Sequence, residues 1–335
     1  MRTPHIEFAV PIEHCDPVMP MSRFLTVLCA LSFAGQVSAQ TLIDEVLKEV
    51  QRTNARGSLA ALGIAGLPDD SASAIALEST GQEDSFDYKS AQLGGGFRLG
   101  ENTPLYLEGY IGYNRYDPVL FLSGTGLSSP LPLKWTSVAA TGGIGWEFDL
   151  AEHLVFRPMV HLSLGRVQSD SSVAAQIISE ELGFDDVSFA KSGGIWAGGY
   201  GASVALAYRR RWESDHELEV TLRHTELEYR PIGEDEDLLV RSRAANAVLW
   251  SRYRFPTGWR LWNRPVRGVT DFSASYLAGD QKYILQTDWL ARIGIGGEVD
   301  FSETWVPIIS TTRFMVRYYE GESVKGFSAG LGVSF

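Results

Sequence analysis

The chain has 335 residues, 44% of them hydrophobic, and its 29 Lys and Arg against 41 Asp and Glu give a formal net charge of −12 at pH 7. This acidic balance argues against a protein that binds nucleic acid. The two cysteines, Cys15 and Cys29, both lie in the first 39 residues, and a chain cleaved after that segment has neither a disulfide framework nor a thiol nucleophile.

Residues 21–39 have the pattern of a secretory signal peptide. Arg23 gives a positive start, residues 24–34 an apolar core, and Ala39 a small-residue cleavage site. Residues 1–20 carry no targeting pattern, and we expect them to be a mis-assigned upstream leader. The hypothesis is export through the general secretory pathway of a Gram-negative bacterium. No run of eighteen apolar residues follows, so a chain of this kind crosses a membrane as strands.

Residues 40–71 are expected to form a helix and a linker. Leu42, Val46 and Val50 recur at helical spacing, which predicts an amphipathic helix over 40–56. Two placements are open: a short helix in the periplasm or against the lumen, or one threaded through a pore. Three glycines and Pro68 predict a linker over 56–71.

From residue 72 to the end the hydrophobic period is 2, which predicts a β-barrel domain over 72–335. The fold class is all-β, a transmembrane antiparallel barrel of about twelve strands with an N-terminal amphipathic helix. The predicted strands are 72–79, 86–99, 104–116, 134–149, 154–168, 193–209, 216–229, 239–255, 266–278, 287–302, 307–320 and 324–335. The alternation of apolar and polar residues is also consistent with a soluble β-domain, which has its apolar face inside. The signal peptide and the strand lengths favour an apolar outer face.

Connections at the two ends of such a barrel differ in length. With the C-terminus in the periplasm, the inner turns are predicted at 100–104, 150–153, 210–215, 256–265 and 302–306, and the outer loops include the long segments 117–134 and 168–192. Tryptophans cluster at both ends and predict two interfacial girdles. The inner girdle has Trp212, Trp259, Trp262 and Trp305, and the outer one Trp135, Trp196 and Trp289.

The last strand, 324–335, carries the clearest family signal. Phe327, Leu331 and Phe335 fall on one face, opposite glycines and serines, and the chain ends on the aromatic residue. With the helix and linker opening and Gly94–Phe97 (GGGF), this closing GFSAGLGVSF resembles the solitary outer-membrane autotransporter-like β-barrels, which carry the translocator barrel without a passenger. The resemblance implies that Phe335 is an assembly signal read by the barrel assembly machinery.

Charged residues alternate with the apolar ones on the face expected to line the lumen. Those singled out are Arg98, Glu147, Arg157, Arg252, Asp288, Arg292, Glu298 and Asp300. Both signs are interspersed. They fit either a cross-linked network around the helix or the wall of a narrow channel, and no ring of one sign marks an ion-selective constriction.

Three groups of residues are candidates for a catalytic or metal site. His161 and Ser163 resemble the His-Ser pair of membrane-embedded phospholipases and lipid A deacylases, but their strand points both into the lumen. Asp215-His216 resembles the pair of outer-membrane aspartyl proteases, at an inner turn instead of the outer rim. The acidic run 233–237 lacks the ligand spacing of a calcium loop. We assign no catalytic, cofactor-binding or metal site, and expect no enzyme and no cofactor.

The sequence therefore predicts an outer-membrane barrel with a structural or surface-interaction role. The alternatives are a small-solute channel gated by the helix or an outer loop and, more weakly, a membrane-embedded hydrolase. Expected partners are outer-membrane lipid and lipopolysaccharide, with no nucleic acid, and the barrel is expected to be a monomer.

Overall fold

The computed structural model describes residues 55–69, 74–79, 86–100, 103–120, 131–132, 134–170, 193–233, 240–300 and 311–334. Twelve long strands make the barrel: β1 Ala74–Ser79, β2 Phe86–Arg98, β3 Leu105–Leu120, β5 Lys134–Trp146, β7 Leu154–Asp170, β8 Gly193–Arg211, β9 Glu217–Pro231, β10 Ser242–Leu261, β11 Arg264–Leu277, β12 Trp289–Asp300, β13 Thr311–Gly321 and β14 Val324–Ser334. The short strands β4 Leu131–Pro132 and β6 Phe148–Ala151, the helix α4 Gln281–Leu285 and a helix at 55–66 complete the described elements.

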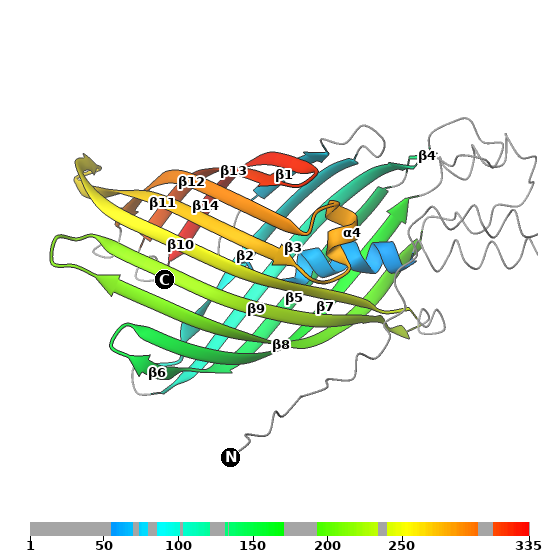
Figure 1. The fold of residues 1–335 in the computed structure, drawn as a ribbon, viewed down its shortest axis with the longest axis horizontal. Coiled ribbons are helices and arrows are strands. Elements are labelled where there is room, and N and C mark those ends of the chain that lie inside the picture. The colour runs from blue at the N-terminus through cyan, green and yellow to red at the C-terminus, as the bar shows by residue number, and fades with distance from the viewer. Residues whose placement is uncertain are drawn as a thin grey trace, which may run out of the picture. The chain divides into compact units, whose positions relative to one another are not determined.

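The twelve long strands form a closed antiparallel ring (Figure 1). Each pairs with the next along the chain, β2 pairs with β3, and β1 closes the ring by pairing with β14 from Ala74↔Ala329 to Ser79↔Val324. Closure leaves no long strand with an unpaired edge, which is the condition for a sheet to lie in lipid. The predicted strand count and pairing of the first strand with the last are confirmed.

The two faces of the wall are chemically opposite. On β12, Ile293 is 63% exposed and Ile295 66%, whereas Arg292 and Glu298 of the same strand are buried in the lumen. On β14, Phe327 is 66% and Leu331 67% exposed. A soluble barrel would place its apolar side chains inside. The apolar outer face therefore rules out the soluble β-domain and fits a wall in contact with acyl chains.

The two ends of the barrel are named here by their connections. The turn end carries the connections 99–104, 152–153, 212–216, 262–263 and 301–310, and the loop end carries 80–85, 121–133, 171–192, 232–241, 278–288 and 322–323. The two longest connections lie at the loop end, as predicted. The expected turn at 256–265 was too long, because β10 continues through an irregular register between Pro256 and Arg260 to a turn at Trp262 and Asn263.

The aromatic girdles are confirmed in part. Trp259 and Trp262 are 76% and 75% exposed at the turn end, and Trp196 and Trp289 are 46% and 44% exposed at the loop end. Trp135, expected in the outer girdle, is instead buried in the lumen against Tyr116, with ring centroids 5.5 Å apart. Trp305 lies outside the described residues.

The helix at 55–66 replaces most of the predicted linker. Its glycines suggested a flexible segment, but Leu59, Leu62, Ala61 and Ala65 also recur at helical spacing and all are buried. Packing inside the barrel overrides the low helix propensity of glycine. Residues 40–54, where most of the helix was expected, lie outside the described residues. Among the described helices, none is long and apolar enough to cross a membrane.

Candidate functional site in the barrel lumen

The helix at 55–66, called the lumen helix below, fills the loop-end half of the lumen. Leu59 and Leu62 are 0% exposed, in one apolar cluster with Tyr229 and Ala244 of the wall. Gly57 lies against the ring of Trp135 at the start of β5, so the helix begins near the loop end and runs inward.

Close approach between the lumen helix and the wall depends on small residues. A side chain at Gly66 would collide with the Tyr229 hydroxyl, and one at Gly112 of β3 would collide with the Ala65 carbonyl. Both glycines therefore allow direct contact between the helix and the barrel wall. Small residues bring helices together in the same way within membranes.

Polar side chains of three wall strands bind the carboxyl-terminal end of the lumen helix. Asn114 Nδ2 donates to the Ala61 carbonyl at 2.5 Å, and Thr141 Oγ1 donates to the Gly66 carbonyl at 2.8 Å. Gln92 Nε2 donates to the carbonyl of Leu67 at 2.7 Å, and its Oε1 accepts from the Asp69 amide at 2.7 Å. The last carbonyls of a helix lack partners within it, so the bonds to Gly66 and Leu67 act as an external cap, whereas the Asn114 bond reaches a carbonyl more than one turn earlier.

One ion pair fastens the segment after the lumen helix. Arg292 Nη1 of β12 lies 3.5 Å from Asp69 Oδ2, and the Arg292 side chain is only 5% exposed. The sequence singled out Arg292 as lumen-lining but gave no indication of its partner. The contacts of Gln92, Asn114 and Thr141 with the helix were not predicted, because a single polar residue on the inner face of a strand looks the same whether it binds a helix or water.

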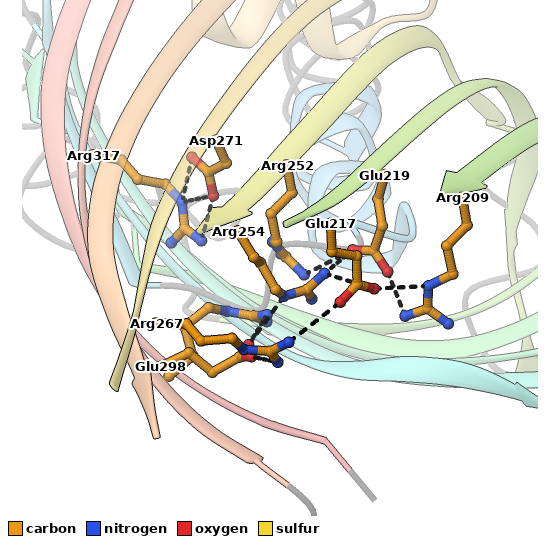
Figure 2. Close-up of polar contacts among 10 residues, drawn as sticks. Arg209, Glu217, Glu219, Arg252, Arg254, Arg267, Asp271, Glu298 and Arg317 are labelled. Carbon is orange, nitrogen blue, oxygen red and sulfur yellow. Dashed lines mark hydrogen bonds and ion pairs between the residues drawn. The ribbon is translucent and has the colours of Figure 1, made fainter. Parts of the chain in front are cut away.

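The turn-end half of the lumen contains a network of arginines and carboxylates from β8 to β13 (Figure 2). Glu298, 1% exposed, pairs with Arg254 at 3.3 Å, with Arg313 at 3.3 Å and with Arg267. Glu219 pairs with Arg209 at 2.5 Å and with Arg254 at 2.9 Å. Each carboxylate is thus shared by two or three guanidinium groups.

A second buried pair lies in the middle of the lumen wall. Arg317 Nη2 is 2.9 Å from Asp271 Oδ2, and both side chains are at most 1% exposed. The two residues come from β13 and β11, and Gly294 of β12 stands between them in register. A side chain at Gly294 would collide with both partners. The pair therefore spans three strands.

A third polar group ties opposite parts of the wall together. Arg223 of β9 donates through Nη2 to Glu108 Oε1 of β3 at 2.6 Å and through Nη1 to Oε2 at 3.1 Å. His161 of β7 shares a hydrogen bond of 2.7 Å between Nε2 and Ser203 Oγ, and its Nδ1 lies 3.4 Å from Glu108. All four residues are buried.

The structure separates His161 from Ser163. Ser163 Oγ is 2.8 Å from Thr141 Oγ1 and accepts from the Tyr229 hydroxyl at 2.9 Å, below the lumen helix. The serine beside His161 is Ser203, which no spacing in the sequence indicated because it lies on the next strand. The resulting line of carboxylate, imidazole and hydroxyl has the residue types of a nucleophile relay. Arg223 occupies both oxygens of its carboxylate and also donates to Ser203 Oγ at 3.3 Å.

The remaining lumen candidates lie in different places. Arg98 and Arg157 flank Glu147 at the turn end, at 3.6 and 2.5 Å. Asp288 lies at the loop-end rim, 55% exposed and 3.6 Å from Lys282. Asp300 ends β12 and pairs with Thr311 in register. Phe335 lies outside the described residues.

The two remaining chemical candidates are dispersed. At the turn between β8 and β9, Asp215 pairs with Arg211 at 3.0 Å, and His216 Nδ1 meets the Tyr253 hydroxyl at 2.6 Å, so each has a partner of its own. Residues 234–237 of the acidic run lie outside the described residues. Among the residues that the structure describes, no three His, Cys, Asp or Glu gather as a metal site.

A closed antiparallel barrel with an apolar outer wall and a charged lumen defines the chain as an outer-membrane β-barrel. No family model and no curated protein matches it. Solved structures similar to it include the β-domain of the Bordetella autotransporter BrkA, at 12% identity and a TM-score of 0.46, covering 78% of this chain and 97% of that one. The transport unit of AIDA-I from Escherichia coli has 12% identity and a TM-score of 0.48, over 84% and 98% of the two chains. The translocator domain of NalP from Neisseria meningitidis has 13% identity and a TM-score of 0.42, over 89% and 99%.

Proposed function

We propose that this protein is a closed outer-membrane barrel with a structural or surface-interaction role, acting through what it presents at its loop end. The observation that carries the proposal is the lumen helix, which is packed on its apolar face and hydrogen-bonded by Gln92, Asn114 and Thr141. A helix held on all these sides closes its half of the pore. The long connections at the same end provide the surface for partners.

Single-channel conductance in a planar bilayer tests the closed state. The intact mature chain should be silent, and so should a chain beginning at Ala55, which keeps the lumen helix. A chain beginning at residue 70 loses the helix and should conduct. Steady conductance of the intact chain would overturn the proposal in favour of transport.

Orientation is tested separately with single cysteines, since a mature chain cleaved after Ala39 has none of its own. Arg56 is exposed at the start of the lumen helix, and Ser214 is exposed at the β8–β9 turn. On intact cells, a membrane-impermeant maleimide should label Arg56→Cys and should label Ser214→Cys only after lysis. The reverse pattern would place the loop end in the periplasm and remove the surface role.

A gated small-solute channel is the second candidate. It is favoured by the polarity of the turn-end half, where arginines and carboxylates line the wall below the lumen helix. In this case the helix is a gate, and conditions that undock it should produce conductance in the intact chain. Substitution of Arg157 or Glu298 should then alter the ion preference of the open pore.

We infer a structural role for the line Glu108–His161–Ser203. A nucleophile relay needs its carboxylate to orient the imidazole, and here Arg223 engages both carboxylate oxygens. These three residues therefore connect strands of the wall by polar contacts. We propose that the chain is not an enzyme. A fluorophosphonate probe should leave Ser203 unmodified, and labelling that Ser203→Ala abolishes would reverse this assignment. We further propose that it is monomeric, is bounded by lipopolysaccharide and is inserted by the barrel assembly machinery after secretory export.

A further inference from the structure

The guanidinium group of Arg252 is buried in the lumen, and two of its nitrogens lack a hydrogen-bond partner among the described residues. The side chain, on β10, is 6% exposed, and its Nη1 lies 3.6 Å from Glu219. The two nitrogens without a partner are Nε and Nη2, and both are buried. One face of the group lies over the ring of Trp250, 4.4 Å from the centroid, which orients the plane of the guanidinium.

The Nε and Nη2 atoms of an arginine form the parallel fork that receives two oxygens of one anion. In three other arginines of this protein that edge is occupied. Arg317 places Nε and Nη2 on Asp271, Arg243 places them on Glu226, and Arg157 places them on Glu147. Arg252 is buried as Arg317 is, yet its fork meets no acceptor among the described residues.

The charges around Arg252 do not balance. Apart from the separate pair of Arg317 and Asp271, the network drawn in Figure 2 joins five arginines to three carboxylates. The arginines are Arg209, Arg252, Arg254, Arg267 and Arg313, and the carboxylates are Glu217, Glu219 and Glu298. Because Arg209 is 69% exposed, four largely buried arginines face three largely buried carboxylates. An excess buried positive charge is costly unless an anion compensates it.

Other unpartnered donors lie on the same part of the wall as this edge. Trp250 Nε1, Arg317 Nη1 and Ser328 Oγ are buried and lack hydrogen-bond partners among the described residues. Trp250 is the next inward residue on β10, whereas Arg317 and Ser328 lie three and four strands away in the row Arg252, Asp271, Gly294, Arg317 and Ser328. Donors of the anion-binding type are thus concentrated on one side of the lumen.

We propose that the lumen binds a small oxyanion of the phosphate class, with the Nε and Nη2 edge of Arg252 as its principal contact. Two oxygens of such an anion match the fork in shape, and its negative charge compensates the excess of buried arginine. The site lies below the lumen helix, on the side of Asp69 that faces the turn end. It is independent of whether the barrel conducts, because a closed lumen can hold a structural anion as well as a permeating one.

Isothermal titration calorimetry of the folded mature barrel in a zwitterionic detergent tests the site with inorganic phosphate. We expect saturable binding of phosphate and none of chloride at the same ionic strength. Arg252→Lys keeps the charge but removes the fork, and should weaken phosphate binding at least about tenfold. Arg157→Lys is the matched control, since its fork already holds Glu147, and should leave the affinity unchanged.

The wild-type measurement decides the proposal even where a variant fails to fold, which heat-modifiable migration in gels reveals. If phosphate produces no saturable heat and no increase in unfolding temperature beyond that of chloride, water alone occupies the edge and the proposal is overturned. It is equally overturned if Arg157→Lys and Arg252→Lys lose affinity to the same extent, because the binding would then reflect general lumen charge.

Discussion

The two halves of the lumen contain different groups. The loop-end half holds a separate element, the lumen helix, whose contacts are an apolar cluster and a few hydrogen bonds from the wall. The turn-end half is lined by charged side chains of the wall itself. A helix can leave without opening a strand pairing, whereas the arginines and carboxylates cannot leave at all. Any gating in this barrel therefore belongs to the loop-end half.

The two halves also differ in how their stability responds to single substitutions. Apolar burial contributes roughly in proportion to area, so the lumen helix loses affinity for the wall in small steps as contacts are removed. A buried ion-pair network contributes little net stability, but removal of one member leaves charges without compensation. The turn-end half should therefore be sensitive to single substitutions that the loop-end half tolerates.

The largest effect is expected for Glu298→Gln. Its carboxylate serves Arg254, Arg267 and Arg313, and its loss leaves three guanidinium groups sharing the remaining acids. We expect the free energy of unfolding in detergent to fall by about 3–5 kcal/mol, measured by urea titration. Glu226→Gln, which removes an exposed partner of Arg243, is the control and should cost less than about 1 kcal/mol. Equal losses would mean that the network is hydrated enough to behave like a surface.

This contrast explains how much the sequence could predict. Twelve strands, their order and their inner faces follow from a period of 2 maintained over the whole domain, because lipid imposes the same alternation on every strand. The segment 56–66 was wrongly predicted as a linker, since Gly57, Gly63 and Gly66 suggest flexibility until the wall that packs on them is known. Ion-pair partners such as Arg223 and Glu108 are 115 positions apart, and only the strand register and the barrel curvature bring them together.

Leu62→Ala should give the next largest effect, confined to the loop-end half. Leu62 is fully buried above Gly165 of β7, and the cavity left by truncation should weaken helix docking by about 2–4 kcal/mol. Hydrogen-exchange mass spectrometry should show faster exchange over 55–66 and unchanged exchange in β12 and β13. Leu62→Met keeps the volume and should cost less than about 1.5 kcal/mol. Faster exchange in the strands as well would show that helix and wall unfold together.

Asn114→Ala should have a smaller effect on the same half. It removes the 2.5 Å hydrogen bond to the Ala61 carbonyl, an uncharged bond worth about 1 kcal/mol. Exchange over 55–66 should accelerate about fivefold, since each 1.4 kcal/mol corresponds to about a factor of ten. Asn114→Asp removes the donor while keeping the shape, and should be at least as damaging. An unchanged rate in both variants would mean that apolar packing alone holds the helix.

Arg211→Ala should have the smallest effect, although it too breaks an ion pair at the turn end. Arg211 and Asp215 are 64% and 66% exposed, so water already solvates both groups and their attraction contributes about 0–0.5 kcal/mol. The urea midpoint should remain within error of the wild type. Arg211 and Glu298 lie at the same end of the barrel and both make ion pairs, so burial is the variable that separates them. A loss from Arg211→Ala approaching that from Glu298→Gln would show that charge pairing at this end, rather than desolvation, sets the sensitivity of the turn-end half.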